Sequence, residues 1–229
     1  MRFGNPQSLA YGAVPASSVS VQERLVFLKK VYGLLGASLL TATVGAYLAS
    51  GPLFEVMVGL HMPLFLLEIG LIFFASYAAR KPGLNMIALF SFTFVSGLTL
   101  GPILGLYIMG GKSTVIAEAF ALTTVVFFGL SAYVVFSRKD FSFMGGFLMT
   151  GLIILVVGSL INMFVGSSMG AFLISGVSVF LFSGFILYDT SNILRNYSTE
   201  DYVSATLALY LDILNLFIAL LNILGLSRD

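Results

Sequence analysis

The sequence predicts an all-α integral membrane protein with seven transmembrane helices. Hydrophobic residues make up 59% of the 229 residues and charged residues only 9%, whereas about a quarter of a soluble domain is charged. A chain with so little charge is expected to be surrounded by lipid rather than by water. Seven spans of about 20 residues would use about 140 residues, which leaves enough chain for short loops.

Seven apolar stretches are separated by short segments rich in glycine, proline or charge, such as RKPG and SRKD. The opening residues are polar and non-periodic, so 1–24 are expected to form a mobile tail, followed by one membrane domain at 25–229. The predicted spans are residues 27–49, 58–79, 84–108, 115–136, 145–165, 170–192 and 202–226.

Basic residues cluster on one side of this topology. The side that carries more Lys and Arg faces the cytoplasm, so the N-terminus is expected in the cytoplasm and the C-terminus outside. G-protein-coupled receptors have the reverse orientation, and the seventh span has no lysine for a retinal Schiff base, so both classes are excluded. The basic side holds Arg2, Arg24, Lys29, Lys30, Arg80, Lys81, Arg138, Lys139 and Arg195, and the other side holds Lys112 and Arg228.

Composition excludes further classes of function. A net charge of +1 without a long basic run argues against a nucleic-acid partner. The absence of cysteine excludes thiolate catalysis and Cys-type zinc sites. The single histidine, His61, is expected in the outer first loop, where it has no partner for zinc. The lipid bilayer is the expected partner, no cofactor is expected, and the oligomeric state stays unknown.

The third span contains three glycines, Gly97, Gly101 and Gly105, spaced four residues apart. Small residues at this spacing let helix backbones approach closely in lipid. The pattern therefore predicts close helix packing along this face.

Four acidic residues fall inside the predicted spans: Glu68, Glu118, Asp189 and Asp212. A charge at the centre of a membrane helix costs at least about 2.5–3.5 kcal/mol, so such residues are candidates for function. Glu118 lies about one turn into its span and can reach the headgroups. Glu68 has only apolar neighbours on its own helix, so it must be protonated or meet a polar group from another span.

The seventh span carries a stripe of small and polar residues on an otherwise apolar helix. A helix that faced lipid would not carry this stripe, so the span is expected to be covered by other helices. An interface joined by asparagine side chains would explain the stripe, but its central acid favours a polar cavity or pore. The stripe consists of Ala205, Ala208, Asp212, Asn215, Ala219 and Asn222.

Asp189 and Asp212 are expected to be neighbours near the cytoplasmic side. If the sixth span continues to Asn196, Asp189 lies about 10 Å from its end, and Asp212 lies about 15 Å from the start of the seventh span. Two carboxyl groups close together away from water share one proton, because two charges there repel. Such a pair could sense pH, and without the proton it would offer hard oxygen ligands that suit Ca²⁺.

Four stretches resemble signatures of the Bax inhibitor-1 family, also called transmembrane Bax inhibitor motif proteins. They are SGLTLGPIL, SRKDFSFMGGFL, GFILYDTSNIL and LYLDILNLFIALLNILG, and the similarity runs from about residue 25 to the C-terminus. The resemblance, strongest to the bacterial branch, implies six helices around a central seventh and a place in the bacterial inner membrane. It also implies a pH-sensing dyad of Asp189 and Asp212.

The resemblance further implies a latch. In bacterial channel-like members an arginine, about three turns after a glutamate, holds one aspartate. Glu68 matches the glutamate, but a count without gaps puts Ala79 at the arginine position and Arg80 one residue later, about 100° around the helix. Whether Arg80 replaces that arginine stays open.

Three hypotheses of function follow. The first is a pH-sensitive Ca²⁺ leak, as in family members, with Asp189 and Asp212 as pH-sensing or ion-binding groups and Glu68, Arg80, Asn215 and Asn222 as candidate gating or pore residues. The second is a regulator that binds an FtsH-type membrane protease, as known for one bacterial subfamily. The third is remote: intramembrane aspartyl proteases also place YD on a sixth span, but here LYLD lacks their glycines, so no enzyme activity is expected.

Overall fold

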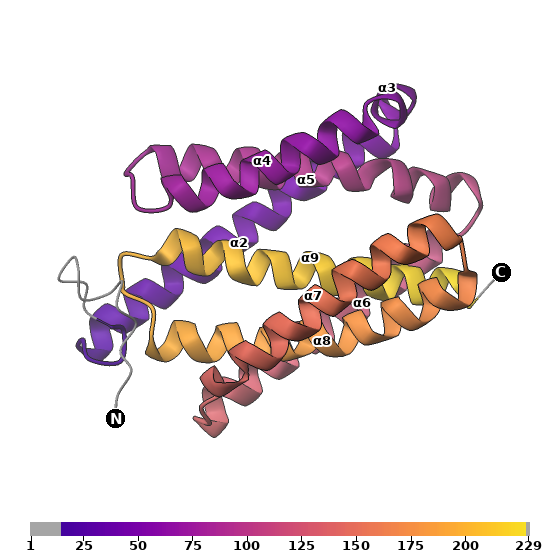
Figure 1. Cartoon of the computed structure of the whole chain (residues 1–229). Coiled ribbons are helices and arrows are strands. Elements are labelled where there is room, and N and C mark those ends of the chain that lie inside the picture. The colour runs from indigo at the N-terminus through magenta and orange to yellow at the C-terminus, as the bar shows by residue number, and fades with distance from the viewer. Residues whose placement is uncertain (1–14, 228–229) are drawn as a thin grey trace. The chain divides into compact units, whose positions relative to one another are not determined.

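The computed structural model describes residues 15–227. Residues 1–14 and 228–229, which include Arg2 and Arg228, lie outside this range. Seven helices in the described part are long and apolar enough to span a membrane, as predicted (Figure 1). The orientation of the termini and the arrangement of six helices around the seventh stay predictions. The described elements, including the short helix α3 and the short 3₁₀ helix η1, are α2 (Val21–Ser50), α3 (Phe54–Gly59), α4 (His61–Ala78), α5 (Leu84–Met109), α6 (Ser113–Ser137), η1 (Ser142–Met144), α7 (Gly145–Val165), α8 (Ser168–Arg195) and α9 (Tyr202–Leu226).

The start of the predicted second span, residues 58–79, differs from the structure. The short helix α3 takes up the second half of the expected first loop, residues 50–57, and α4 begins only at His61. Our placement of His61 in a loop was therefore wrong, since it is the first residue of a helix. Pro63 lies in the first turn of α4, where its missing N–H leaves no helical hydrogen bond unmade.

Residues 15–24 are structured, and hydrogen bonds hold them to a distant part of the chain. Ser20 and Glu23 form a capping box that starts α2 at Val21, so the predicted tail boundary at residue 24 falls inside a helix. The Ala16 N–H donates to the Tyr197 carbonyl at 2.9 Å, which ties this segment to the α8–α9 connection. Residues 1–14, where a mobile tail was also predicted, lie outside the described residues.

The described helices form two compact units. Unit 1 contains the described residues up to Gly110 together with Ile193–Tyr210, and unit 2 contains Gly111–Asn192 together with the described residues from Leu211 onward. The single domain predicted for 25–229 stays a prediction.

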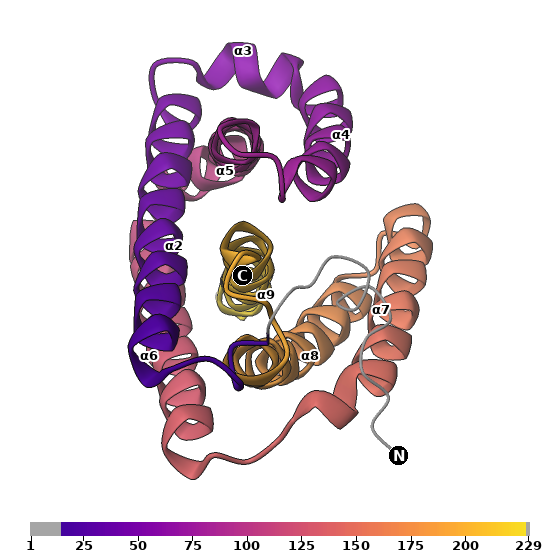
Figure 2. The ribbon, with the colours of Figure 1, turned by 90° about the vertical axis from the view of Figure 1, so that its left-hand side faces the viewer.

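In unit 1, α5 lies between α2 and α4, and α3 joins their ends (Figure 2). The predicted close packing of the glycines is confirmed. A Cβ atom on Gly97 would collide with the backbone of Ala42, and one on Gly101 would collide with Ala49 on α2, while Gly105 faces the ring of Phe54. Only residues without a side chain allow α2 and α5 to approach this closely.

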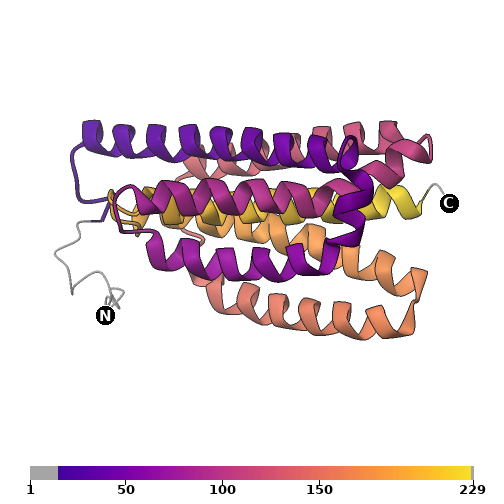
Figure 3. The ribbon, with the colours of Figure 1, turned by 90° about the horizontal axis from the view of Figure 1, so that it is seen from above.

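In unit 2, α7 packs against α8 (Figure 3). Gly151 on α7 faces Leu181 on α8, and Leu148, which is 1% exposed, fills the space beside Gly184. Between the two helices, Gly166 adopts a φ of 67° and its N–H bonds to the Asn162 carbonyl at 2.8 Å. This left-handed residue ends α7 and lets the chain reverse within two residues.

Candidate functional site

Asp189 on α8 and Asp212 on α9 both belong to unit 2. Their side chains lie within hydrogen-bonding reach of each other. Asp212 is only 4% exposed, and its Oδ2 atom is buried without a hydrogen-bond partner in the described structure. Ionised carboxylates only accept hydrogen bonds, so a bond between these two requires one proton on the pair. Both groups lie on helices that can span a membrane, where a second negative charge is costly.

The residues after Asp189 hold this end of α8 in place. Thr190, which is 1% exposed, lies 3.4 Å from the Ser131 hydroxyl on α6. The Ser191 hydroxyl accepts from the Phe141 N–H at 3.0 Å and donates to Asp140 Oδ1 at 3.4 Å. The motif YDTSN thus combines a half-buried acid with two buried hydroxyls that fix its helix to α6 and to the SRKD segment. The sequence analysis did not predict these contacts, although Thr190 and Ser191 directly follow Asp189 in the chain.

The polar stripe of α9 lies on a helix without an exposed residue, which agrees with the expectation that this span is covered. Ala205 and Ala219 are buried, and Asn215 and Asn222 are half-buried. The Asn215 side-chain amide donates to the Leu211 carbonyl on its own helix at 2.7 Å. That amide is therefore partly occupied within α9.

Glu68 is half-buried on α4, and its carboxyl group lies near the Thr99 hydroxyl on α5. The structure thus supplies the polar group from another helix that the sequence required. Thr99 also donates its hydroxyl proton to the Val95 carbonyl at 3.0 Å. While that bond is made, Glu68 can bond to Thr99 only as a protonated donor. Glu118 is half-buried in the second turn of α6.

A buried pair of hydroxyls, Ser96 on α5 and Tyr210 on α9, was not anticipated. The two oxygens are hydrogen-bonded, and Ser96 also donates to the Thr93 carbonyl at 3.0 Å. The Tyr210 ring is fully buried and meets Phe92 edge to face, with 5.7 Å between ring centroids. Ser96 lies in the motif SGLTLGPIL and Tyr210 in LYLD. Their polar side chains inside apolar runs could have indicated this buried contact.

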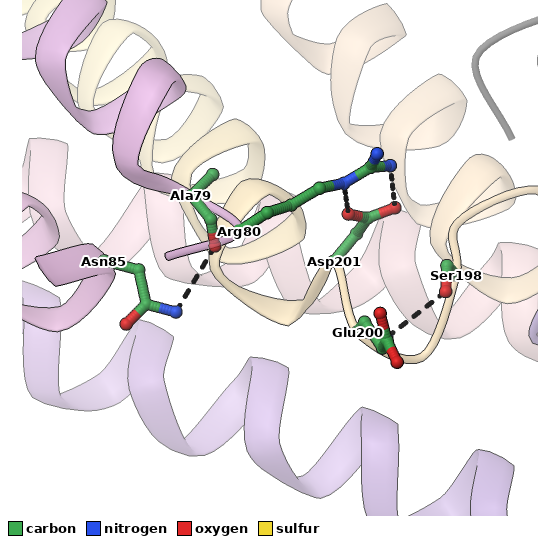
Figure 4. Close-up of polar contacts among 6 residues, drawn as sticks. All are labelled: Ala79, Arg80, Asn85, Ser198, Glu200 and Asp201. Carbon is green, nitrogen blue, oxygen red and sulfur yellow. Dashed lines mark hydrogen bonds and ion pairs between the residues drawn. The ribbon is translucent and has the colours of Figure 1, made fainter. Parts of the chain in front are cut away.

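Arg80 is paired with Asp201, an acid that sequence reasoning did not single out. Two hydrogen bonds join them, from Nε to Oδ1 at 2.7 Å and from Nη2 to Oδ2 at 3.0 Å (Figure 4). Asp201 directly precedes α9, and its carbonyl accepts the Ala205 N–H. The pair therefore ties the turn after α4 to the start of α9, while a role of Arg80 in gating stays a prediction.

The dyad provides few ligands for a resident metal ion. Within residues 15–227, no group of three or more His, Cys, Asp or Glu side chains gathers at one place. Ca²⁺ takes six to eight oxygen ligands, and two carboxyl groups provide at most four. A Ca²⁺ ion at Asp189 and Asp212 would thus depend on water or backbone carbonyls for its remaining ligands.

Comparison with known proteins gives consistent matches along the chain. It is 46% identical over 207 residues to an uncharacterized protein of Campylobacter jejuni, covering 88% of this chain and 89% of the relative. It is 40% identical over 209 residues to the Escherichia coli modulator of FtsH protease YccA, covering 88% and 91%. A Golgi anti-apoptotic protein of vaccinia virus is 37% identical over 225 residues, covering 95% and 92%.

A family model described as inhibitor of apoptosis-promoting Bax1 matches residues 24–229. Relatives in Vibrio cholerae and Escherichia coli carry the names membrane protein and inner membrane protein, and the seven apolar helices agree with that location. The chain is a membrane protein of the Bax inhibitor-1 family.

Proposed function

We propose that this protein is a pH-sensitive cation leak whose gate is the pair Asp189 and Asp212. The observation that carries the proposal is the contact between two carboxyl groups on α8 and α9, both inside helices that can span a membrane. Ca²⁺ is the proposed cargo, because oxygen ligands with negative charge suit a hard divalent cation.

The proposed gate works through the shared proton. With one proton on the pair, a hydrogen bond joins α8 to α9 and holds the closed state. When the proton leaves, two like charges repel each other in a place of low dielectric, and the helices separate. The freed carboxylates then attract a cation. Rising pH therefore opens the leak, and falling pH closes it.

Ca²⁺ flux into liposomes that contain the purified protein tests this proposal. Wild-type flux should rise with pH. Asp189→Asn and Asp212→Asn should each remove that pH dependence, because a side-chain amide forms hydrogen bonds but does not ionise. Glu118→Gln is the matched control, since it removes an acid on α6 outside the pair. Unchanged pH-dependent flux in both Asn variants would sink the proposal.

A second candidate function is the regulation of an FtsH-type membrane protease. The named Escherichia coli relative, a modulator of that protease, supports it. Cells that carry this protein should then show slower degradation of an FtsH substrate, and the protease should co-purify with the protein. If Asp189→Asn abolishes pH-dependent flux but leaves that degradation rate unchanged, the two activities are separate. Absence of both co-purification and any change in degradation would refute the second candidate.

A further inference from the structure

A pocket of about 580 Å³ opens in unit 1 where three segments of the chain meet. Its walls come from the first turns of α2, from the turn between α4 and α5, and from the connection between α8 and α9. Pockets of about 300–1,000 Å³ are the size that small ligands occupy. The pocket lies at the ends of helices that can span a membrane, which is where lipid headgroups would meet it.

Two opposite charges line this pocket: Lys30 from α2 and Glu200 from the α8–α9 connection. Both side chains are exposed, and within residues 15–227 neither charged group takes part in an ion pair. The Lys30 ammonium lies 5.2 Å from the centroid of the Tyr202 ring. That contact uses the face of the ring and leaves the ammonium's N–H donors available to a ligand.

The other charged residues of the pocket are already engaged. Arg80 forms its two hydrogen bonds with Asp201, and Glu23 accepts from the N–H and hydroxyl of Ser20 in the capping box. Figure 4 shows Glu200 on the same short connection as Asp201. The pocket thus presents one available cation and one available anion, which match a ligand that carries both charges.

Apolar residues complete the pocket. The Phe27 ring, 2% exposed, is buried at its side, and Val26, 49% exposed, stands beside it on α2. An exposed apolar side chain next to a charged pocket at the interface suits a ligand with both a polar head and an apolar tail.

We propose that this pocket binds the headgroup of a phosphatidylethanolamine lipid, with its phosphate at Lys30 and its primary ammonium at Glu200. A primary ammonium donates charge-assisted hydrogen bonds to a carboxylate, whereas the quaternary ammonium of phosphatidylcholine has no N–H to donate. Phosphatidylglycerol carries the phosphate alone, so Glu200 repels it. The acyl chains then lie along Val26.

Native mass spectrometry of the detergent-solubilised full-length protein tests this site with three lipids of identical acyl chains. The wild-type protein should retain phosphatidylethanolamine about threefold to fivefold better than phosphatidylcholine or phosphatidylglycerol, the range expected of one exposed ion pair. Lys30→Gln should weaken retention of all three lipids, because each has a phosphate. Glu200→Gln should abolish only the preference for phosphatidylethanolamine and increase retention of phosphatidylglycerol.

Lys29→Gln and Glu55→Gln are matched controls, because both residues are exposed charges outside the pocket, and both should behave like wild type. Equal unfolding temperatures of all variants show that the fold is kept. Equal retention of the three lipids by the wild type, or equal effects of Glu55→Gln and Glu200→Gln, overturns the site. If the wild type prefers phosphatidylglycerol, the pocket acts only as a basic surface and the proposal is wrong. If glycerophosphoethanolamine competes with the lipid at equal concentration, the pocket binds a soluble ligand rather than a lipid.

Discussion

Arg80 and Asp201 form a bidentate ion pair with both contacts at 3.0 Å or less, although 121 positions separate them in the chain. The Arg80 side chain is 47% exposed and that of Asp201 is 13% exposed. The pair connects the end of α4 with the start of α9, the helix that carries Asp212 eleven residues further along.

Loss of the Arg80–Asp201 pair should cost little stability. Arg80→Ala or Asp201→Ala should each lower the free energy of unfolding by about 1 kcal/mol or less, because solvent screens the partly exposed arginine. That corresponds to a fall in unfolding temperature of about 2–4 °C at most, measurable by a thermal melt in detergent. The Arg80→Asp, Asp201→Arg double variant should recover part of the loss. If the two alanine effects add fully in a double-mutant cycle, the ion pair contributes nothing.

Gly97→Ala should destabilise the protein by about 1–3 kcal/mol, because the new methyl group would press against the Ala42 backbone on α2. Gly36→Ala on α2 is the control, since a methyl group there meets nothing within 4 Å. That control should be neutral or should stabilise the helix by up to about 1 kcal/mol. Thermal melts of both variants measure the difference. Equal melting of the two would contradict the close packing of α2 and α5.

The Ser96–Tyr210 hydrogen bond predicts an asymmetric pair of variants. Tyr210→Phe removes a hydroxyl whose partner Ser96 still donates to Thr93, so it should cost about 1 kcal/mol. Ser96→Ala leaves the buried Tyr210 hydroxyl without this partner and should cost more, about 1–3 kcal/mol. The double variant should be less unstable than the sum of the two singles. Additive costs in chemical or thermal unfolding would argue against a shared bond.

The pH response of the leak should depend on the dyad alone among the acids of unit 2. Below the pH at which the shared proton leaves, flux should be low and should resemble that of Asp212→Asn. Above it, wild-type flux should rise while both Asn variants stay flat, because only the wild type gains a second negative charge. Stopped-flow recording of a Ca²⁺ dye inside liposomes across a pH series measures this. A wild-type flux that falls as pH rises would reverse the proposed gate.

The fold followed from the sequence wherever a local property decides it. Long apolar runs require lipid, and glycine or charge interrupts them, so the spans at 145–165 and 202–226 coincide with α7 and with α9. The spacing of Gly97, Gly101 and Gly105 predicted a close helix contact, because only small residues allow one. The error at His61 arose where α3 replaced an expected loop, since a short helix has too few residues to produce a periodic signal.

The sequence by itself determined the class of the protein, the number of its spans and which acids lie inside them, because these depend on the transfer of side chains into lipid. Only the tertiary structure decided the partners of those residues. It paired Arg80 with Asp201, Glu68 with Thr99 and Ser96 with Tyr210. Each partner lies on a different element, and hydrogen bonds depend on distances of a few tenths of an ångström. Such distances arise from the packing of whole helices, which no local pattern records.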